Sequence, residues 1–179
     1  MIIKIVSGGQ TGPDRAALDI AIELNIPHGG WCPKGRLAEL GGLIPHKYSL
    51  QETDSSDFSI RTKRNIEDSD GTLIFVPKLP LTVTDGTILT IQEVKEKNKP
   101  YLIFDLSNPP ENNAVEQWIR CHDIKTLNVA GPRESQSPGI YSQTYIFLKT
   151  VITHSISNSL AASDNEPDGS ATSRPAARL

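Results

Sequence analysis

Short apolar runs recur along the chain at intervals that leave room for one helix between most neighbours. Each run is rich in β-branched or aromatic residues, as strands are. The opening run, MIIKIVS, is almost entirely apolar, which is typical of a parallel strand buried on both faces. The runs predict strands at residues 1–7, 26–31, 71–76, 101–106 and 124–131.

Amphipathic or alanine-rich stretches lie between these runs and predict helices. Pro13 suits the first turn of a helix, Asp14 suits its positive end, and Pro100 must follow the end of another. The predicted helices cover about residues 13–24, 57–68 and 86–99, a stretch around 114–119, and a last helix carrying Tyr141, Tyr145, Leu148 and Ile152 on one face. Strands alternating with helices predict an α/β fold whose mainly parallel five-stranded sheet is covered on both sides.

Two segments depart from this alternation. Residues 32–56 are irregular and rich in Gly, Pro and polar residues, and so long a connection in a compact domain points to a functional loop. From residue 157 onward the sequence lacks periodicity and aromatic residues. We therefore expect one domain over residues 1–156 and a disordered C-terminal tail over residues 157–179.

Composition narrows the class of protein. The 179 residues suit one domain, and a formal charge of −3 argues against a nucleic-acid partner. Two cysteines cannot build a disulfide framework and fit a reducing compartment. Lys4 interrupts the opening apolar run, no signal-peptide pattern is present and no run has membrane-spanning length. We expect a cytoplasmic protein without membrane contact.

The first strand leads into the sequence SGGQTG, which places glycines where a strand meets a helix. Ligands of open parallel sheets sit at the carboxyl ends of strands, and helix N-termini attract anions. Glycine allows close backbone approach and polar side chains can add hydrogen bonds, so six residues are candidates for anion binding: Ser7, Gly8, Gly9, Gln10, Thr11 and Gly12. The pattern is neither GxGxxG nor a Walker A loop, and a plain strand-to-helix turn is the alternative.

Other predicted loops should emerge at the same edge of the sheet. Several carry cations or a glycine-led helix start, an unusual concentration in a chain of net negative charge. Together they predict an anion site and add the candidates Lys34, Arg36, Arg61, Asn65, Gly86, Thr87 and Arg133.

Four stretches, SGGQTGPDRAALD, GGWCPKGR, RTKRNIEDSDGTLIF and LNVAGPRES, resemble the molybdenum carrier family. This family is similar to the molybdenum cofactor carrier proteins and belongs to a group of Rossmann-like folds that includes the cytokinin-activating phosphoribohydrolases. The resemblance covers about residues 2–150, and at residues 85–87 this chain has Asp-Gly-Thr in place of Gly-Gly-Thr.

The resemblance implies a Rossmann-like three-layer sandwich, a homo-oligomer, and binding of molybdenum cofactor, a phosphate-bearing molybdopterin, for delivery to molybdoenzymes. It implies that residues 8–12 face the phosphate. It also implies that the rest of the site is lined by Lys34, Arg36, Arg61, Asn65, Thr87 and Arg133.

The sequence favours a carrier or storage protein without a chemical step. The related phosphoribohydrolases use a glutamate where this chain has Thr90, and threonine cannot replace a carboxylate in acid–base work. Asp14 is interpreted as a residue that complements the helix dipole. The histidines show no metal-ligand spacing, so no metal site is expected. A nucleotide-binding or nucleotide-hydrolysing protein and a nucleotide-sensing module remain the alternatives.

Overall fold

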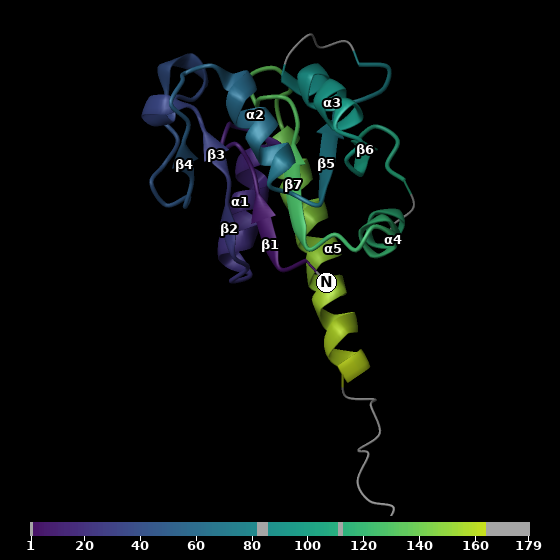
Figure 1. Cartoon of the computed structure of the whole chain (residues 1–179). Helices are drawn as coiled ribbons and strands as arrows, with labels where there is room; N and C mark the ends of the chain where they lie inside the picture. The colour runs from purple at the N-terminus through teal and green to yellow at the C-terminus, as the bar shows by residue number, and fades with distance from the viewer. Residues whose placement is uncertain (1, 82–85, 111–112, 164–179) are drawn as a thin grey trace, which may run out of the picture.

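A five-stranded, all-parallel sheet forms the centre of the molecule (Figure 1). The computed structural model describes residues 2–81, 86–110 and 113–163. The strands are adjacent in the order β2-β1-β7-β5-β6. Their bounds are β1 Lys4–Val6, β2 His28–Gly29, β5 Gly71–Val76, β6 Tyr101–Asp105 and β7 Thr126–Ala130. The predicted α/β class and parallel five-stranded sheet are confirmed.

Five helices cover the two faces of this sheet, which gives the three layers of a Rossmann-like sandwich. One face carries α1, α5 and α4, whose apolar residues share a core with the sheet, and the other face carries α2 and α3. Their bounds are α1 Pro13–Glu23, α2 Phe58–Glu67, α3 Gly86–Glu96, α4 Ala114–Cys121 and α5 Ile140–Ser163.

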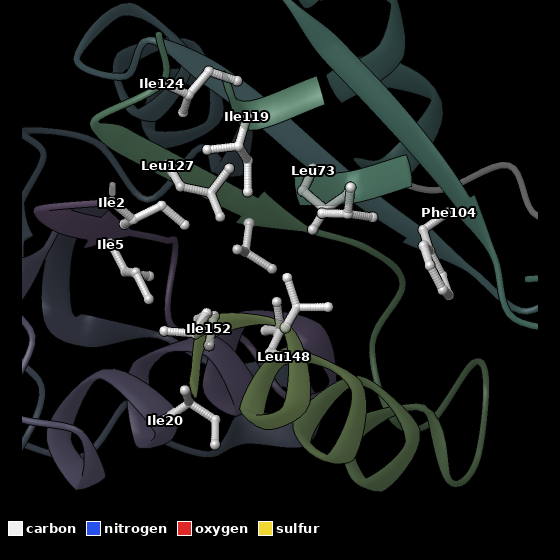
Figure 2. Close-up of a cluster of buried hydrophobic side chains, with 14 of the residues drawn as sticks. Ile2, Ile5, Ile20, Leu73, Phe104, Ile119, Ile124, Leu127, Leu148 and Ile152 are labelled. Atoms are coloured by element: carbon white, nitrogen blue, oxygen red, sulfur yellow. The ribbon is translucent and has the colours of Figure 1, made fainter. Parts of the chain in front are cut away.

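The two cores follow from the alternation of side chains along the strands. All of β5 is buried: Leu73 and Phe75 pack beneath α1 and α5, whereas Ile74 and Val76 pack against α2 and α3. Figure 2 shows the larger core, in which residues of the strands meet the apolar faces of α1 and α5. A strand buried on both faces must be apolar at every position, which is why β5 shows no polar alternation.

The strand order is that of a circularly permuted Rossmann sheet. The common Rossmann order is 3-2-1-4-5, and moving the first strand to the end of the chain produces the order observed here. By this correspondence β7 occupies the position of the first Rossmann strand, and β1 that of the second. The junction of β7 and β5 is then the topological switch point, where ligands of such sheets bind.

The predicted strand 26–31 is divided in the structure. Its first part is β2, whereas Trp31–Cys32 forms β3, which pairs with β4 (Gln51–Glu52) in a separate two-stranded sheet. Gly30, with φ of 120°, makes the break, because a Cβ there would lie 2.5 Å from the carbonyl oxygen of Ser7. The 32–56 connection is therefore partly ordered, and it also contains two short 3₁₀ segments, η1 Lys34–Arg36 and η2 Glu39–Gly41.

The last helix is longer than the sequence predicts. The expected boundary between domain and tail at residue 157 falls inside α5, which continues to Ser163. Small and polar residues at 157–163 lack an apolar stripe, so the sequence pattern carried no sign of this continuation. Residues 164–179 lie outside the described part of the chain. None of the described helices, α5 included, is long and apolar enough to cross a membrane.

Substitution of Phe104 tests how much packing in the larger core stabilises the fold. It is buried and its ring centroid lies 5.2 Å from that of Phe75 and 4.1 Å from that of Phe147. We expect Phe104→Ala to lower the free energy of unfolding by about 3–5 kcal/mol in urea titrations. Ile146, which is 67% exposed, provides the control, and Ile146→Ala should change stability by no more than about 0.5 kcal/mol. Equal losses from both substitutions would contradict this description of the core.

Candidate functional site

A small cavity opens at the carboxyl edge of the sheet, beside the ends of β1 and β7. Its volume is about 100 Å³. Four parts of the chain supply its walls: the turn after β1, the first two turns of α2, the start of α3 and the turn after β7. The lining residues are Gln10, Asp14, Phe58, Arg61, Thr62, Gly86, Leu89, Thr90, Ala130, Gly131 and Arg133. The cavity thus unites segments that are more than a hundred residues apart.

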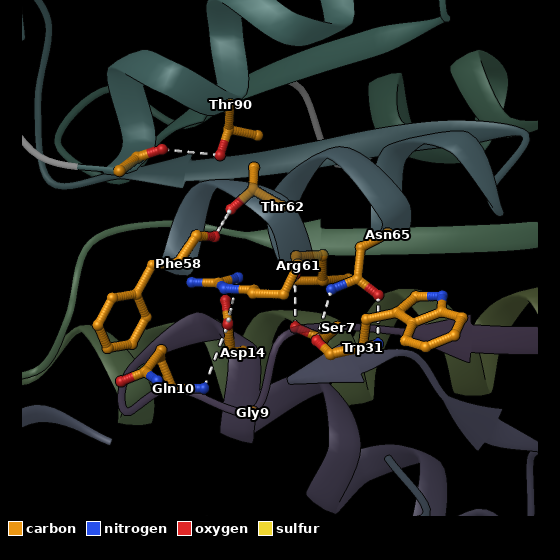
Figure 3. A network of polar contacts seen from close by, with 12 residues as sticks. Ser7, Gly9, Gln10, Asp14, Trp31, Phe58, Arg61, Thr62, Asn65 and Thr90 are labelled. Atoms are coloured by element: carbon orange, nitrogen blue, oxygen red, sulfur yellow. Dashed lines mark hydrogen bonds and ion pairs between the residues drawn. The ribbon is translucent and has the colours of Figure 1, made fainter. Parts of the chain in front are cut away.

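A part-buried ion pair forms one wall of the cavity. Figure 3 shows the side chain of Arg61, from α2, reaching over Asp14 in the first turn of α1. Arg61 Nη1 lies 3.4 Å from Asp14 Oδ2, and the backbone N–H of Gln10 donates to the same oxygen at 3.2 Å. Burial raises the pKa of Asp14, although the positive charge of Arg61 acts in the opposite direction. A carboxyl group with a raised pKa in a cavity is a candidate functional group.

Two buried polar atoms at this wall have no hydrogen-bond partner in the described part of the chain, Gln10 Oε1 and Arg61 Nε. The amide of Gln10 is oriented by its Nε2 group, which donates to the carbonyl oxygen of Leu37 at 2.8 Å. Buried polar groups are normally paired, and an unpaired group needs an explanation. One acceptor and one donor are therefore available here to a bound molecule.

Arg133 brings a second guanidinium group to the cavity. It follows β7 and its guanidinium lies 4.9 Å from the centroid of the Phe58 ring, a cation–π contact that holds the charge at the cavity wall. Within the described residues this guanidinium forms no hydrogen bond, so its five N–H donors remain available. The two arginines make the cavity suitable for an oxyanion.

The glycines of the turn after β1 are in close contact with other parts of the chain. A Cβ on Gly8 would lie 2.0 Å from Arg61 Nη1, and one on Gly9 would lie 2.6 Å from Leu50 Cδ1. A Cβ on Gly12 would lie 2.5 Å from the carbonyl oxygen of Pro132. Close backbone approach, which the sequence analysis related to a ligand, is thus made at all three positions by the protein itself.

The other residues of this turn are also in contact with the chain. Ser7 is buried and its hydroxyl donates to the carbonyl oxygen of Val129 on the neighbouring strand β7 at 2.7 Å. The hydroxyl of Thr11 donates to Glu39. Of the six candidates in this turn, Gln10 alone is among the residues that line the cavity.

Arg36 stabilises a loop and does not line the cavity. Its side chain is buried and donates to four carbonyl oxygens, those of Ile44 at 3.0 Å, Leu50 at 3.2 Å, Pro45 at 2.9 Å and Tyr48 at 3.0 Å. These contacts engage the guanidinium with main-chain carbonyl groups of the 32–56 connection and so stabilise its fold. Arg36 was predicted to line the anion site, but charge alone does not distinguish an arginine that binds a ligand from one that binds main-chain carbonyl groups.

Asn65 and Lys34 are likewise not in the cavity wall. Asn65 is buried, accepts from the backbone N–H of Trp31 at 2.7 Å and donates to its carbonyl oxygen at 3.0 Å, which joins α2 to β3. Lys34 is exposed on η1. The structure thus brings Gln10, Arg61, Gly86 and Arg133 together and places Lys34, Arg36 and Asn65 elsewhere.

The start of α3 carries no carboxylate into the cavity. Thr90 lines the cavity and donates to the carbonyl oxygen of Gly86 at 2.8 Å. Glu93 is buried one turn later, where it pairs with Lys63 of α2 at 2.9 Å. Thr87 is buried beside the cavity, and Asp85 lies outside the described residues. The carboxylate that does line the cavity is Asp14, from α1.

Two lining residues of α2, Phe58 and Thr62, were not among the predicted site residues. Together with Arg61 and Asn65 they stand at positions i, i+3, i+4 and i+7, so they share one helix face. That spacing was a usable signal. The prediction for this helix rested on charged and amide side chains, and Phe58 and Thr62 carry neither.

The described residues provide no metal site, since no group of three or more His, Cys, Asp or Glu side chains is placed to hold an ion. Cys32 is buried in the hydrophobic cluster beneath the 32–56 connection, so it is a packing residue. Burial also raises the pKa of its thiol, which disfavours the reactive thiolate.

Comparison with known proteins agrees with the permuted strand order. Residues 5–152 match the model of the circularly permutated YpsA SLOG family. A solved structure from Syntrophus aciditrophicus SB, named Putative molybdenum carrier protein, is 47% identical, with a TM-score of 0.78 over 84% of this chain and 95% of that one. None of the curated proteins matches the chain. The chain belongs to the circularly permutated YpsA SLOG family.

Replacing Asp14 by asparagine, its neutral isostere, tests whether the buried negative charge of Asp14 destabilises the fold. Burial raises the pKa of Asp14 in the folded state. The ionised carboxylate therefore lowers the free energy of unfolding once the pH exceeds the unfolded-state pKa of about 3.9. We expect Asp14→Asn to raise the melting temperature at about pH 7 by about 2–4 °C, the effect of about 1 kcal/mol. The difference should disappear near pH 3, where the carboxyl group is protonated in both states.

Asp54→Asn is the matched control, because Asp54 is exposed and makes no ion pair with the described residues. Calorimetric scans across this pH range give the measurement. A lower melting temperature for Asp14→Asn at pH 7 would mean that attraction to Arg61 outweighs the cost of burial.

Proposed function

We propose that the cavity binds the phosphate group of molybdenum cofactor and that the protein carries or stores this cofactor without transforming it. The observation that carries the proposal is the convergence of Arg61 and Arg133 on one small cavity at the start of α3. Helix N-termini and paired guanidinium groups are both favourable for phosphate. The name of the Syntrophus protein, Putative molybdenum carrier protein, supports the choice of cofactor.

The size of the cavity supports a phosphate as the group that enters it. A volume of about 100 Å³ equals the space of about three water molecules, whereas sites for complete cofactors measure about 300–1,000 Å³. The phosphate would sit against the arginines, and the pterin would extend over the rim. Gln10 Oε1 is the acceptor available to a donor group of the same ligand.

The absence of a carboxylate at Thr90 supports carriage over cleavage of a glycosidic bond, since the helix that supplies the glutamate in phosphoribohydrolases supplies a hydroxyl here. A carrier would deliver its cofactor to molybdoenzymes. The expected homo-oligomer and cytoplasmic location stay predictions.

Arg133 gives the sharpest test of this function, because its side chain makes no hydrogen bond with any residue that the structure describes. We expect Arg133→Met to weaken binding of molybdenum cofactor by about 10–100-fold, the loss of one charge-assisted contact. Anaerobic equilibrium titration against cofactor, molybdate and nucleoside monophosphates measures this loss and the ligand preference together.

Lys149→Met is the control, since it removes the same charge from an exposed pair with Glu23 on α1. It should bind like the parent. Equal affinity of the parent and Arg133→Met would show that the phosphate binds elsewhere, and preference for a nucleotide would replace the cofactor in the proposal.

Asp14 favours a second candidate, hydrolysis of a nucleotide. It is a buried carboxyl group with a raised pKa, which suits a general acid or base, and it lies beside Arg61 in the cavity wall. On this alternative the protein should turn over at least one nucleoside monophosphate, and Asp14→Asn should abolish turnover while preserving binding. No turnover across the panel would leave the carrier role.

A further inference from the structure

A carboxylate of the chain itself occupies a group of oxyanion donors next to the cavity. Glu39 lies on η2, in the middle of the 32–56 connection. One of its carboxylate oxygens accepts a hydrogen bond from the hydroxyl of Thr11, and the other accepts one from the hydroxyl of Ser135. These two donors follow β1 and β7, so Glu39 bridges the turns after two neighbouring strands.

The donors around Glu39 have the features of an anion site. The hydroxyl of Thr11 accepts from the backbone N–H of Glu134 at 3.1 Å, which leaves its own proton directed at Glu39. The backbone N–H of Ser135 and the positive charge of Arg133 also help to lower the pKa of the carboxylate. Burial raises the pKa of Glu39, but the hydrogen bonds from Ser135 and Thr11 outweigh it and the pKa is lowered.

The segment that carries Glu39 is held at its base, where Gln10 Nε2 donates to the carbonyl oxygen of Leu37 and Ala38 is buried, but its tip is free of the core. Residues 40–43 are exposed, and Leu40 is 92% exposed in a left-handed conformation, with φ of 55°. Within the segment, the N–H of Ala38 donates to the carbonyl oxygen of Gly42, and the N–H of Gly42 donates to that of Glu39. These two hydrogen bonds close the backbone of the segment on itself. Glu39 can therefore leave its donors without breaking an element of the sheet or a helix.

We infer that Thr11 and Ser135 form an anion subsite separate from the cavity, and that Glu39 holds this subsite until an oxyanion, such as phosphate, displaces it. Arg133 links the two positions, because it lines the cavity and also acts on Glu39. A ligand with two anionic groups can then use both positions at once. The inference does not depend on the proposed function, since it concerns donors that the cavity wall does not include.

Titration with inorganic phosphate can be followed by the amide resonances of Thr11 and Ser135 in two-dimensional NMR spectra, and the variants below separate this subsite from the cavity. Glu39→Gln keeps the size of the side chain and removes its charge. If Glu39 occupies the subsite for about nine-tenths of the time, it reduces the apparent affinity about tenfold. We therefore expect phosphate to shift the Ser135 resonance in Glu39→Gln at a concentration at least about tenfold lower than in the parent.

Two further variants test whether the gain in phosphate affinity arises from Glu39 and Ser135. Asp54→Asn removes an exposed charge from the same connection and should titrate like the parent. Combining Glu39→Gln with Ser135→Ala should abolish the gain. Equal midpoints for Glu39→Gln and the parent would overturn the inference, as would an equal gain from Asp54→Asn or a gain that survives Ser135→Ala.

The unmodified protein provides an independent measurement. Saturating phosphate should speed amide hydrogen exchange of residues 37–43, because displaced Glu39 no longer holds this segment. Unchanged or slower exchange in that segment would equally overturn the inference.

Discussion

The close approach of the turns after β1 and β7 is the constraint on which the site depends. These strands are parallel neighbours, so their carboxyl ends meet and both turns leave at the same level. Gly12 faces the carbonyl oxygen of Pro132, and Gly131 faces the ring of Pro13, at distances that leave no space for a Cβ on either glycine. Because the backbones are in contact, Asp14 and Arg133 reach one cavity.

This constraint gives the glycines a role in packing. The fit of one turn against the other sets the position of α1, which places Asp14 under Arg61. Replacing these glycines would therefore disturb the fold as well as any ligand. The cavity itself depends on side chains of α2 and on Arg133 in the turn after β7, and those can be exchanged with less effect on the backbone.

Charge is distributed over the site in two distinct ways. Arg36 and Asp14 are buried, yet Arg36 is saturated by carbonyl oxygens whereas the burial of Asp14 opposes its ionisation. Arg133 and Glu39 lie nearer to solvent and can change partners at lower cost, because water replaces the lost hydrogen bonds. We expect the ion pair of Asp14 and Arg61 to set the shape of the cavity, and Arg133 and Glu39 to respond to ligands.

The sequence by itself determined the five strands, the helices between them, and the edge of the sheet at which the candidate cavity opens. Periodicity reports burial, and the carboxyl ends of parallel strands always meet at one edge, so no further information was needed for these conclusions. Only the tertiary structure decided which polar residues share the cavity, because that depends on side-chain direction and on partners distant in sequence. It placed Arg61 and Arg133 in the cavity and Arg36 among carbonyl oxygens, although all three are arginines in predicted loops or helices at that edge. It also showed that the space left by the missing side chains of Gly8, Gly9 and Gly12 is filled by other parts of the chain. A glycine pattern in the sequence indicates a close approach but does not identify the group that approaches.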